Sequence, residues 1–434
     1  MQSDCPYNWD REACSSETMN TCAMDQECFR KHFKDFDDWK RTSNLLEDVN
    51  AVLDLTIKHD VETRQILFLT TLSMYGPNPQ NTILKGPTSI GKTYLATQVI
   101  CLFPKDDLII RGGSSPKSFF HQKDAHVTWD DDRKAHVFNL KHKHLCWLDM
   151  PGDKLLDNLK PLLSHDRPEL IYDITDKSGS GQTRTKKVIL SGWPSVTFIT
   201  TKLPTDPELA NRCWLLSASD RPEKIADALK LKTSQLTDEK AWNEALEANP
   251  LRRRIKQLIE NIRNAGPIEI KRPDLSQFEI EFNKSFSSHQ VPRIMRDYPR
   301  IIGLADAITL LYRFQRETSP SILTQTYEDI YKAFELSKPY LISMKYGVPP
   351  SVLEFYDRVM VPLRSQTIEG YKPELEEISR QYYQAYHQTI GQWSLEQGYL
   401  RALKDAGIIH AEPSETDKRV KVYDILPLSL EISS

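Results

Sequence analysis

Residues 86–93 read Gly-Pro-Thr-Ser-Ile-Gly-Lys-Thr, a complete G-x-x-x-x-G-K-T sequence. An apolar stretch at 82–84 precedes it and a helical pattern at 94–100 follows, so we expect a strand, a tight loop and a helix. Such a loop turns its N–H groups inward, and the helix adds the positive end of its dipole. Although a simple glycine turn is the alternative, the stretch predicts a nucleoside triphosphate site formed by Gly86, Pro87, Thr88, Ser89, Ile90, Gly91, Lys92 and Thr93.

Two further positions complete the expected phosphate chemistry. Lys92 would reach the β- and γ-phosphates, and the Thr93 hydroxyl would bind Mg²⁺. The apolar run 145–149 ends in Asp149, which we expect to be the second Mg²⁺ ligand at a strand end, although it could instead cap a turn. Asp153 is the candidate for positioning the attacking water.

The composition is that of a soluble protein with several domains. The chain has 434 residues, of which 39% are hydrophobic and 27% charged. The most apolar long stretch, 301–314, contains Asp306 and is too short to span a bilayer, and the first residues show no basic region followed by an apolar one. We therefore expect a cytoplasmic location without membrane contact. A net charge of −3 implies that any nucleic-acid binding depends on local basic patches.

Short apolar runs alternate with helical patterns between residues 60 and 220. This alternation predicts an α/β core of three α/β/α layers around a mostly parallel sheet. The expected strands are 82–84, 108–111, 145–149, 196–200 and 213–216. Residues 1–59 read as a polar and helical N-terminal appendage, residues 221–349 as a helical lid, and residues 366–434 as a separate C-terminal unit.

Cysteines crowd the N-terminal appendage. Cys14, Cys22, Cys28 and His32 could bind zinc, although their spacing matches no common zinc module. Unpaired loop cysteines and disulfides are the alternatives.

The strand expected at 196–200 ends in Thr200 and Thr201. At the carboxyl edge of a parallel sheet these hydroxyls would face the γ-phosphate. Arg212 follows shortly afterwards, directly before the next apolar run. An arginine there can project into the site of a neighbouring subunit and stabilise transition-state charge.

This order of motifs resembles the AAA+ ATPases over about residues 60–345. The loop at 86–93 corresponds to Walker A, Asp149 to Walker B, Thr200 and Thr201 to sensor 1, and Arg212 to the arginine finger. The resemblance implies ATP and Mg²⁺ as cofactors. It also implies a homo-oligomeric ring, with a hexamer expected, because Arg212 would act in a neighbouring site.

Two segments narrow the resemblance to the minichromosome-maintenance (MCM) helicases and related helicases of plasmids, phages and integrative elements. Residues 171–189 read as a β-hairpin before sensor 1, and in MCM-like rings such a hairpin lines the channel for single-stranded DNA. An ordinary surface hairpin is the alternative. Residues 292–307 are similar to the MCM lid segment, with Arg296 as first choice for the sensor 2 arginine and Arg300 as second. The candidate phosphate contacts in the hairpin are Lys177, Arg184, Lys186 and Lys187.

The C-terminal unit resembles a winged helix. Helical patterns at 374–388 and 394–406 precede two alternating strands, 408–412 and 419–425. Such domains commonly place the second helix in the major groove of duplex DNA, where Arg401 and Lys404 would be the contacts. Protein binding is the alternative, because Glu396 and Asp405 lie on the same helix.

Together these features predict an ATP-dependent DNA helicase of the MCM-like type, acting in the replication of a mobile element, virus or plasmid. An AAA+ initiator or loader that uses ATP as a switch is the first alternative. It is favoured by Met150, which stands where many such ATPases carry a glutamate directly after the Walker B aspartate. A signalling or scaffold ATPase with a protein-binding winged helix is the second alternative.

Overall fold

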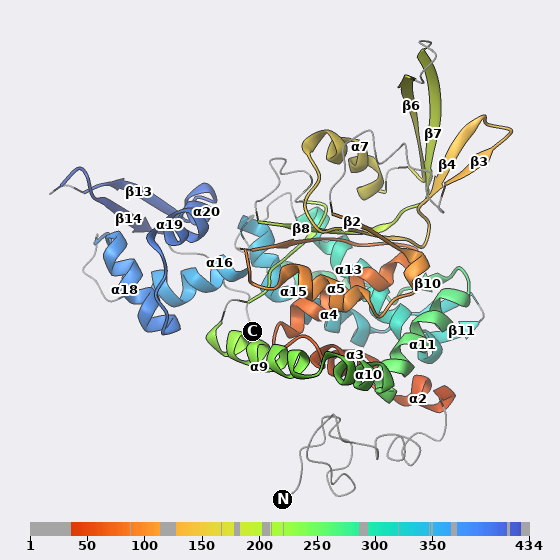
Figure 1. Ribbon diagram of the computed structural model, residues 1–434, viewed down its shortest axis with the longest axis horizontal. Coiled ribbons are helices and arrows are strands. Elements are labelled where there is room, and N and C mark those ends of the chain that lie inside the picture. Colours follow the sequence, from red (N-terminus) through yellow and green to blue (C-terminus); the bar gives the residue numbers. More distant parts are fainter. Residues whose placement is uncertain are drawn as a thin grey trace, which may run out of the picture.

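The computed structural model describes residues 36–86, 88–112, 127–165, 167–177, 183–201, 209, 211–219, 221–285, 294–319, 321–346, 348, 350–365, 371–414 and 417–426. At its centre is a five-stranded parallel sheet in the order β2-β5-β8-β1-β9 (Figure 1). The mixed α/β class and all five strands are therefore confirmed. The strands are β1 (Asn81–Lys85), β2 (Leu108–Arg111), β5 (His144–Trp147), β8 (Ser195–Thr200) and β9 (Trp214–Leu216).

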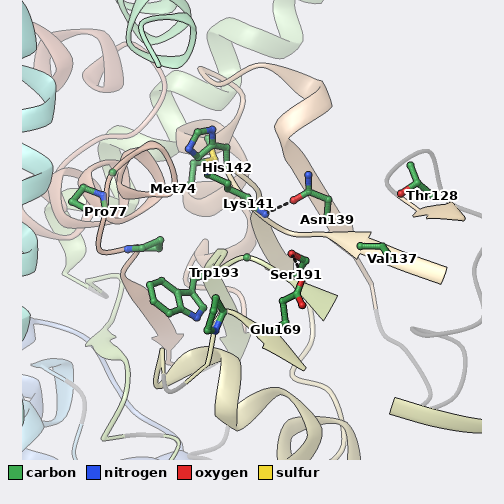
Figure 2. A pocket seen from close by; sticks show the side chains of 14 residues that line it. Met74, Pro77, Thr128, Val137, Asn139, Lys141, His142, Glu169, Ser191 and Trp193 are labelled. Atoms are coloured by element: carbon green, nitrogen blue, oxygen red, sulfur yellow. Dashed lines mark hydrogen bonds between the residues drawn. The ribbon is translucent and has the colours of Figure 1, made fainter. Parts of the chain in front are cut away.

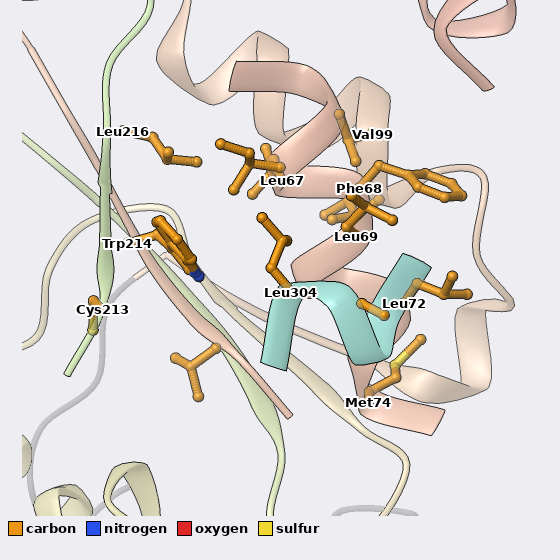
Figure 3. Close-up of a cluster of buried hydrophobic side chains, with 14 of the residues drawn as sticks. Leu67, Phe68, Leu69, Leu72, Met74, Val99, Cys213, Trp214, Leu216 and Leu304 are labelled. Atoms are coloured by element: carbon orange, nitrogen blue, oxygen red, sulfur yellow. The ribbon is translucent and has the colours of Figure 1, made fainter. Parts of the chain in front are cut away.

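Helices cover the two faces of the central sheet. On one side lie α4, α5, α13 and α15, and on the other lies α7 (Figure 1). Side chains of α4, β9 and α13 share one core, in which Leu67, Trp214 and Leu304 are fully or almost fully buried (Figure 3). The bounds are α4 (Val61–Leu72), α5 (Lys92–Ile100), α7 (Asp153–Leu163), α13 (Ile294–Leu311) and α15 (Tyr327–Tyr346).

Much of the segment expected to be a lid belongs to this main core. Helix α13 packs on α4 and α15, and α15 packs on β9. Nearly every residue from 301 to 311 is buried, as expected for a helix that is apolar on all sides. The other elements of this part are α9 (Pro222–Thr237), α10 (Glu239–Ala248), α11 (Pro250–Asn264), α12 (Ser276–Ser285), α14 (Arg313–Arg316) and a small sheet of β10 (Glu269–Lys271), β11 (Glu317–Ser319) and β12 (Ile322–Thr324).

The described part of the expected appendage also joins the main core. Helices α2 (Phe36–Thr42) and α3 (Leu45–Asp54) bury Trp39 and Leu45 completely. The Trp39 indole donates a 2.9 Å hydrogen bond to Asp48 Oδ2. Because large apolar side chains at this position are removed from water, α2 and α3 contribute to the stability of the core. Two short 3₁₀ turns, η1 (Ser73–Tyr75) and η2 (Lys105–Asp107), precede β1 and β2.

A second sheet of four strands projects from the core in the order β3-β4-β7-β6 (Figure 1). The expected hairpin is confirmed as β6 (Glu169–Lys177) paired antiparallel with β7 (Thr183–Ser191). A second hairpin, β3 (Val127–Asp130) with β4 (Ala135–Asn139), was not predicted. It joins the first through parallel pairing of β4 with β7.

The C-terminal part has a hydrophobic cluster of its own, from Val348 to Ile425. Helical segments precede a two-stranded antiparallel sheet, which agrees with the predicted order of elements. Among the described residues, no helix is both long and apolar enough to cross a membrane. The elements are α16 (Pro350–Phe355), η3 (Tyr356–Met360), α17 (Val361–Ser365), α18 (Leu375–Tyr386), α19 (Gln392–Ser394), η4 (Leu395–Leu400), α20 (Arg401–Asp405), β13 (Ile409–Pro413) and β14 (Lys421–Ile425).

Candidate nucleotide site and nucleic-acid surfaces

The loop at 86–93 joins the end of β1 to the start of α5. Ser89 and Gly91 take positive φ angles of 68° and 85°, and glycine adopts this conformation without steric cost. A Cβ atom on Gly86 would lie only 2.3 Å from Cδ1 of Ile90, so the Ile90 side chain lies close over Gly86. Gly91 is therefore required by its positive φ angle, whereas a side chain at Gly86 would require the end of the Ile90 side chain to move. Pro87 lies outside the described residues.

Lys92 is directed back toward the loop. Its ammonium donates a 2.8 Å hydrogen bond to the Gly86 carbonyl, and the residue is 7% exposed. Burial lowers the pKa of Lys92. Thr93, at the start of the same helix, is exposed. The loop therefore combines a largely buried cation with an accessible hydroxyl at a helix N-terminus, a setting that suits a polyphosphate and its metal ion.

Strand β8 brings the predicted threonines beside this loop. The Gly86 N–H donates a 3.3 Å hydrogen bond to the Thr200 carbonyl, and Lys85 pairs with Thr200 in the sheet. Thr200 is buried, whereas Thr201 is exposed. Thr200 thus lies at the same level of the sheet as the start of the loop.

Asp149 reaches the same edge from β5. Trp147, the last residue of β5, pairs with Phe198 of β8, so Asp149 lies as far beyond Trp147 as Thr200 lies beyond Phe198. Asp149 is exposed. The residue directly after Asp149 is Met150 and not a carboxylate, and its side chain is partly buried against the main core. Asp153 is exposed in the first turn of α7.

Arg212 contacts the C-terminal end of α7. Its guanidinium donates to the Lys160 carbonyl at 2.5 Å and to Ser164 Oγ at 2.9 Å, both at the C-terminal end of α7. A cation at this end interacts favourably with the helix dipole. The action of Arg212 in a neighbouring subunit stays a prediction, and the structure adds a local contact to α7.

The two sensor 2 candidates lie in different surroundings on α13. Arg296 is exposed. Arg300 is buried, donates to Asp297 Oδ1 at 2.8 Å and to the Asn211 carbonyl, and stacks over Trp214. Burial is the main cause of the lowered pKa of Arg300. Arg300 therefore ties α13 to the residue preceding Arg212, and Arg296 is the accessible arginine of the pair.

The hairpin β6–β7 presents charge on both faces. Lys186 and Lys187 are adjacent and half-exposed, so they lie on opposite faces of the strand. The backbones of Lys177 and Arg184 belong to the pairing near the tip, but their side chains lie outside the described residues. The unpredicted hairpin β3–β4 adds Trp129, which is 51% exposed. Alternating strands around the turn at 131–134 were the signal that could have identified it.

The C-terminal basic residues have acidic neighbours. Arg401 lies 3.7 Å from Asp405 Oδ2 and donates to Gln397 Oε1 at 3.3 Å. Lys404 is exposed. Trp393, on the same helical segment, is 76% exposed. This surface therefore offers an exposed aromatic residue and two basic groups, one of which is balanced by a carboxylate.

Two residues beside the loop at 86–93, which is called the phosphate loop from here on, were missed by the sequence analysis. Lys224 of α9 contacts the Ile90 carbonyl, and Asp60 pairs with Lys224. Neither residue belongs to a motif, so no sequence signal identified them.

A cavity of about 680 Å³ lies away from the phosphate loop. Its lining comes from segments that precede β1, β5 and β8, and from β3, β4, β6 and β7. It therefore lies at the amino ends of the parallel strands, whereas the phosphate loop follows the carboxyl end of β1. Figure 2 shows Trp193, His142, Lys141 and Glu169 in its wall.

Within the described segments, no three histidine, cysteine or acidic side chains gather as a metal site. The proposed zinc residues Cys14, Cys22, Cys28 and His32 lie outside those segments. A comparison of the sequence with protein-family models finds no match, and a comparison with curated proteins finds none either.

Proposed function

We propose that this protein is an ATP-driven DNA translocase of the AAA+ MCM-like type, working as a ring. The observation that carries the proposal is the carboxyl edge of the central sheet. It brings the phosphate loop, Thr200 and Asp149 together from three different strands. In open α/β sheets this edge is where ligands bind.

The side chains present suit ATP and Mg²⁺. Lys92 would contact the phosphates, and Thr93 and Asp149 are both exposed oxygen donors of the kind that Mg²⁺ prefers. When bound, Mg²⁺-ATP supplies the phosphoanhydride whose hydrolysis drives the motor. Arg212 and Arg296 would complete the site around the γ-phosphate.

Helix α7 supports coupling between this site and the hairpin β6–β7, which we propose contacts DNA. It begins shortly after Asp149, its C-terminal end is held by Arg212, and the Tyr172 hydroxyl of β6 donates to its Asn158 carbonyl. A helix that follows Asp149 in the chain and contacts both Arg212 and β6 can move the hairpin when the site changes state. Lys186 and Lys187 would then carry single-stranded DNA by phosphate contact.

The test is ATP turnover with and without single-stranded DNA, for wild type, Lys92→Ala, Arg212→Ala and a mixture of the two variants. DNA-stimulated turnover that each variant loses, and that mixing partly restores, is the expected result for a shared-site ring. Thermal unfolding of Arg212→Ala must accompany the assay, because this variant also loses the contact to α7. Strand separation is then measured on a forked duplex.

Met150 favours a second function, an AAA+ initiator or loader in which ATP is a switch. Its partly buried thioether cannot position a water molecule for attack. Tight ATP binding with negligible turnover, whether or not DNA is present, would support this second function and exclude the motor.

A further inference from the structure

A lysine outside the phosphate-loop motif contacts the loop backbone. Lys224 lies in the first turn of α9, and its ammonium donates to the Ile90 carbonyl at 3.4 Å and to the Ser219 carbonyl at 2.9 Å. Its side chain is 11% exposed. One cation therefore links the loop at 86–93, the segment after β9 and helix α9.

Asp60 anchors this cation from a fourth segment, directly before α4. Its Oδ2 lies 2.5 Å from the Lys224 ammonium, and its side chain is 2% exposed. Its other oxygen, Oδ1, accepts a 2.7 Å hydrogen bond from the Ser219 N–H. Asp60 itself takes a positive φ of 50°. Because a buried cation is costly without a partner, the Asp60 carboxylate offsets the cost of placing the Lys224 ammonium beside the loop.

The contact at Ile90 restrains a strained part of the loop. Ser89 and Gly91, on either side of Ile90, both have positive φ, and for Ser89 this conformation costs about 1 kcal/mol. In a planar trans peptide the C=O and N–H point in opposite directions. Holding the Ile90 carbonyl toward Lys224 therefore directs the Gly91 N–H away from Lys224.

We propose that Lys224, anchored by Asp60, is a positioning residue for the phosphate loop. It selects the orientation of the Ile90–Gly91 peptide in which the Gly91 N–H is presented to a bound phosphate. The inference rests on the proposed nucleotide site and adds a residue to it. It also makes the position of α9 a determinant of nucleotide affinity, since Lys224 moves with that helix.

The test compares Lys224→Met with Lys230→Met by titration calorimetry with ATP and Mg²⁺. Lys230 lies on the same helix, is 80% exposed and pairs with Asp227, so it is the matched control. Loss of a charge-assisted hydrogen bond predicts a Kd raised about tenfold for Lys224→Met, and an unchanged Kd for Lys230→Met. Lys224→Arg, which keeps charge and donors, should recover affinity to within about threefold of wild type.

Thermal unfolding without nucleotide separates positioning from stability. Asp60→Asn is the second variant if Lys224→Met does not fold, because it keeps the Ser219 contact and removes the charge; it should also raise Kd several-fold. A wild-type Kd in folded Lys224→Met, or in Asp60→Asn, overturns the inference even if the unfolding temperature falls. Wild-type protein that fails to bind ATP, or Lys92→Ala that binds as well as wild type, instead overturns the proposed function and the inference with it.

Discussion

Aspartates lie at both ends of the parallel strands of the central sheet, but in opposite environments. The amino ends of the strands form one edge, called the amino edge, and their carboxyl ends form the carboxyl edge. Asp107, just before β2 at the amino edge, is 2% exposed and accepts from Tyr75 at 2.8 Å and from Lys143 at 3.0 Å. Nε of Arg263 lies 2.6 Å from Oδ2, the oxygen that also accepts from Tyr75. Asp149, just after β5 at the carboxyl edge, is exposed. A carboxylate surrounded by donors stabilises the fold, whereas an accessible one can bind a metal ion.

The same contrast applies to the cations. At the amino edge Lys143 forms an ion pair with Asp107. At the carboxyl edge Lys92 is bonded to a backbone carbonyl within its own loop, and a carbonyl is a weaker partner for an ammonium than a phosphate would be. The comparison therefore predicts that mutations at the carboxyl edge change activity and mutations at the amino edge change stability.

The largest expected effect is at the carboxyl edge. Asp149→Asn should lower ATP turnover by about 100-fold or more, because the amide is a poor Mg²⁺ ligand and charge stabilisation is lost. The unfolding temperature should hardly change, as is usual for an exposed position. Turnover and thermal unfolding are measured together. Asp157→Asn, an exposed position on α7, is the control, and an equal loss in both variants would break the comparison.

At the amino edge the opposite result is expected. Asp107→Asn should lower the free energy of unfolding by about 3 kcal/mol, since Lys143 and Arg263 lose a buried carboxylate. The Kd for ATP of the folded fraction should stay within about twofold of wild type, a difference below 0.5 kcal/mol. Urea unfolding and calorimetry check the two quantities. Asp106→Asn, on the exposed neighbouring residue, should change neither.

The smallest effect is a pH dependence at the same edge. His144 is buried at the start of β5, its Nδ1 lies 2.7 Å from Ser195 Oγ, and burial lowers its pKa to about 3. In the unfolded chain His144 takes up a proton as the pH falls through 6.5, whereas in the folded protein it stays neutral there. The free energy of unfolding therefore falls as the pH drops below 6.5. Between pH 7 and pH 5 this histidine should remove about 2 kcal/mol.

His144→Asn should remove that part of the pH dependence. The measurement is urea unfolding at pH 7 and pH 5 for wild type and variant, with His410→Asn on the exposed face of β13 as the control. An identical pH dependence in wild type and His144→Asn would show that the amino edge is not responsible.

Local patterns predicted the five central strands and the hairpin β6–β7, because apolar runs bounded by turns identify buried strands. They did not place α13 in the main core, although its run from 301 to 311 is apolar on nearly every side. The hairpin β3–β4 was missed because its strands are short and partly polar. Lys224 and Asp60 could not be found, since their partners are distant in sequence: Lys224 and Ile90 are 134 residues apart.

The sequence by itself predicted the tight loop at 86–93, because its glycines and the Lys92 contact to Gly86 lie within eight consecutive residues. The contacts from Thr200 and Lys224 come from distant segments. It also determined which strands carry Asp149 and Thr200. The tertiary structure alone decided which charged groups are accessible, since burial depends on contacts between distant segments, as when Arg263 reaches Asp107 across 156 residues. It likewise decided that Arg300 is buried and bonded to Asp297 and Asn211, whereas Arg296 on the same helix is exposed.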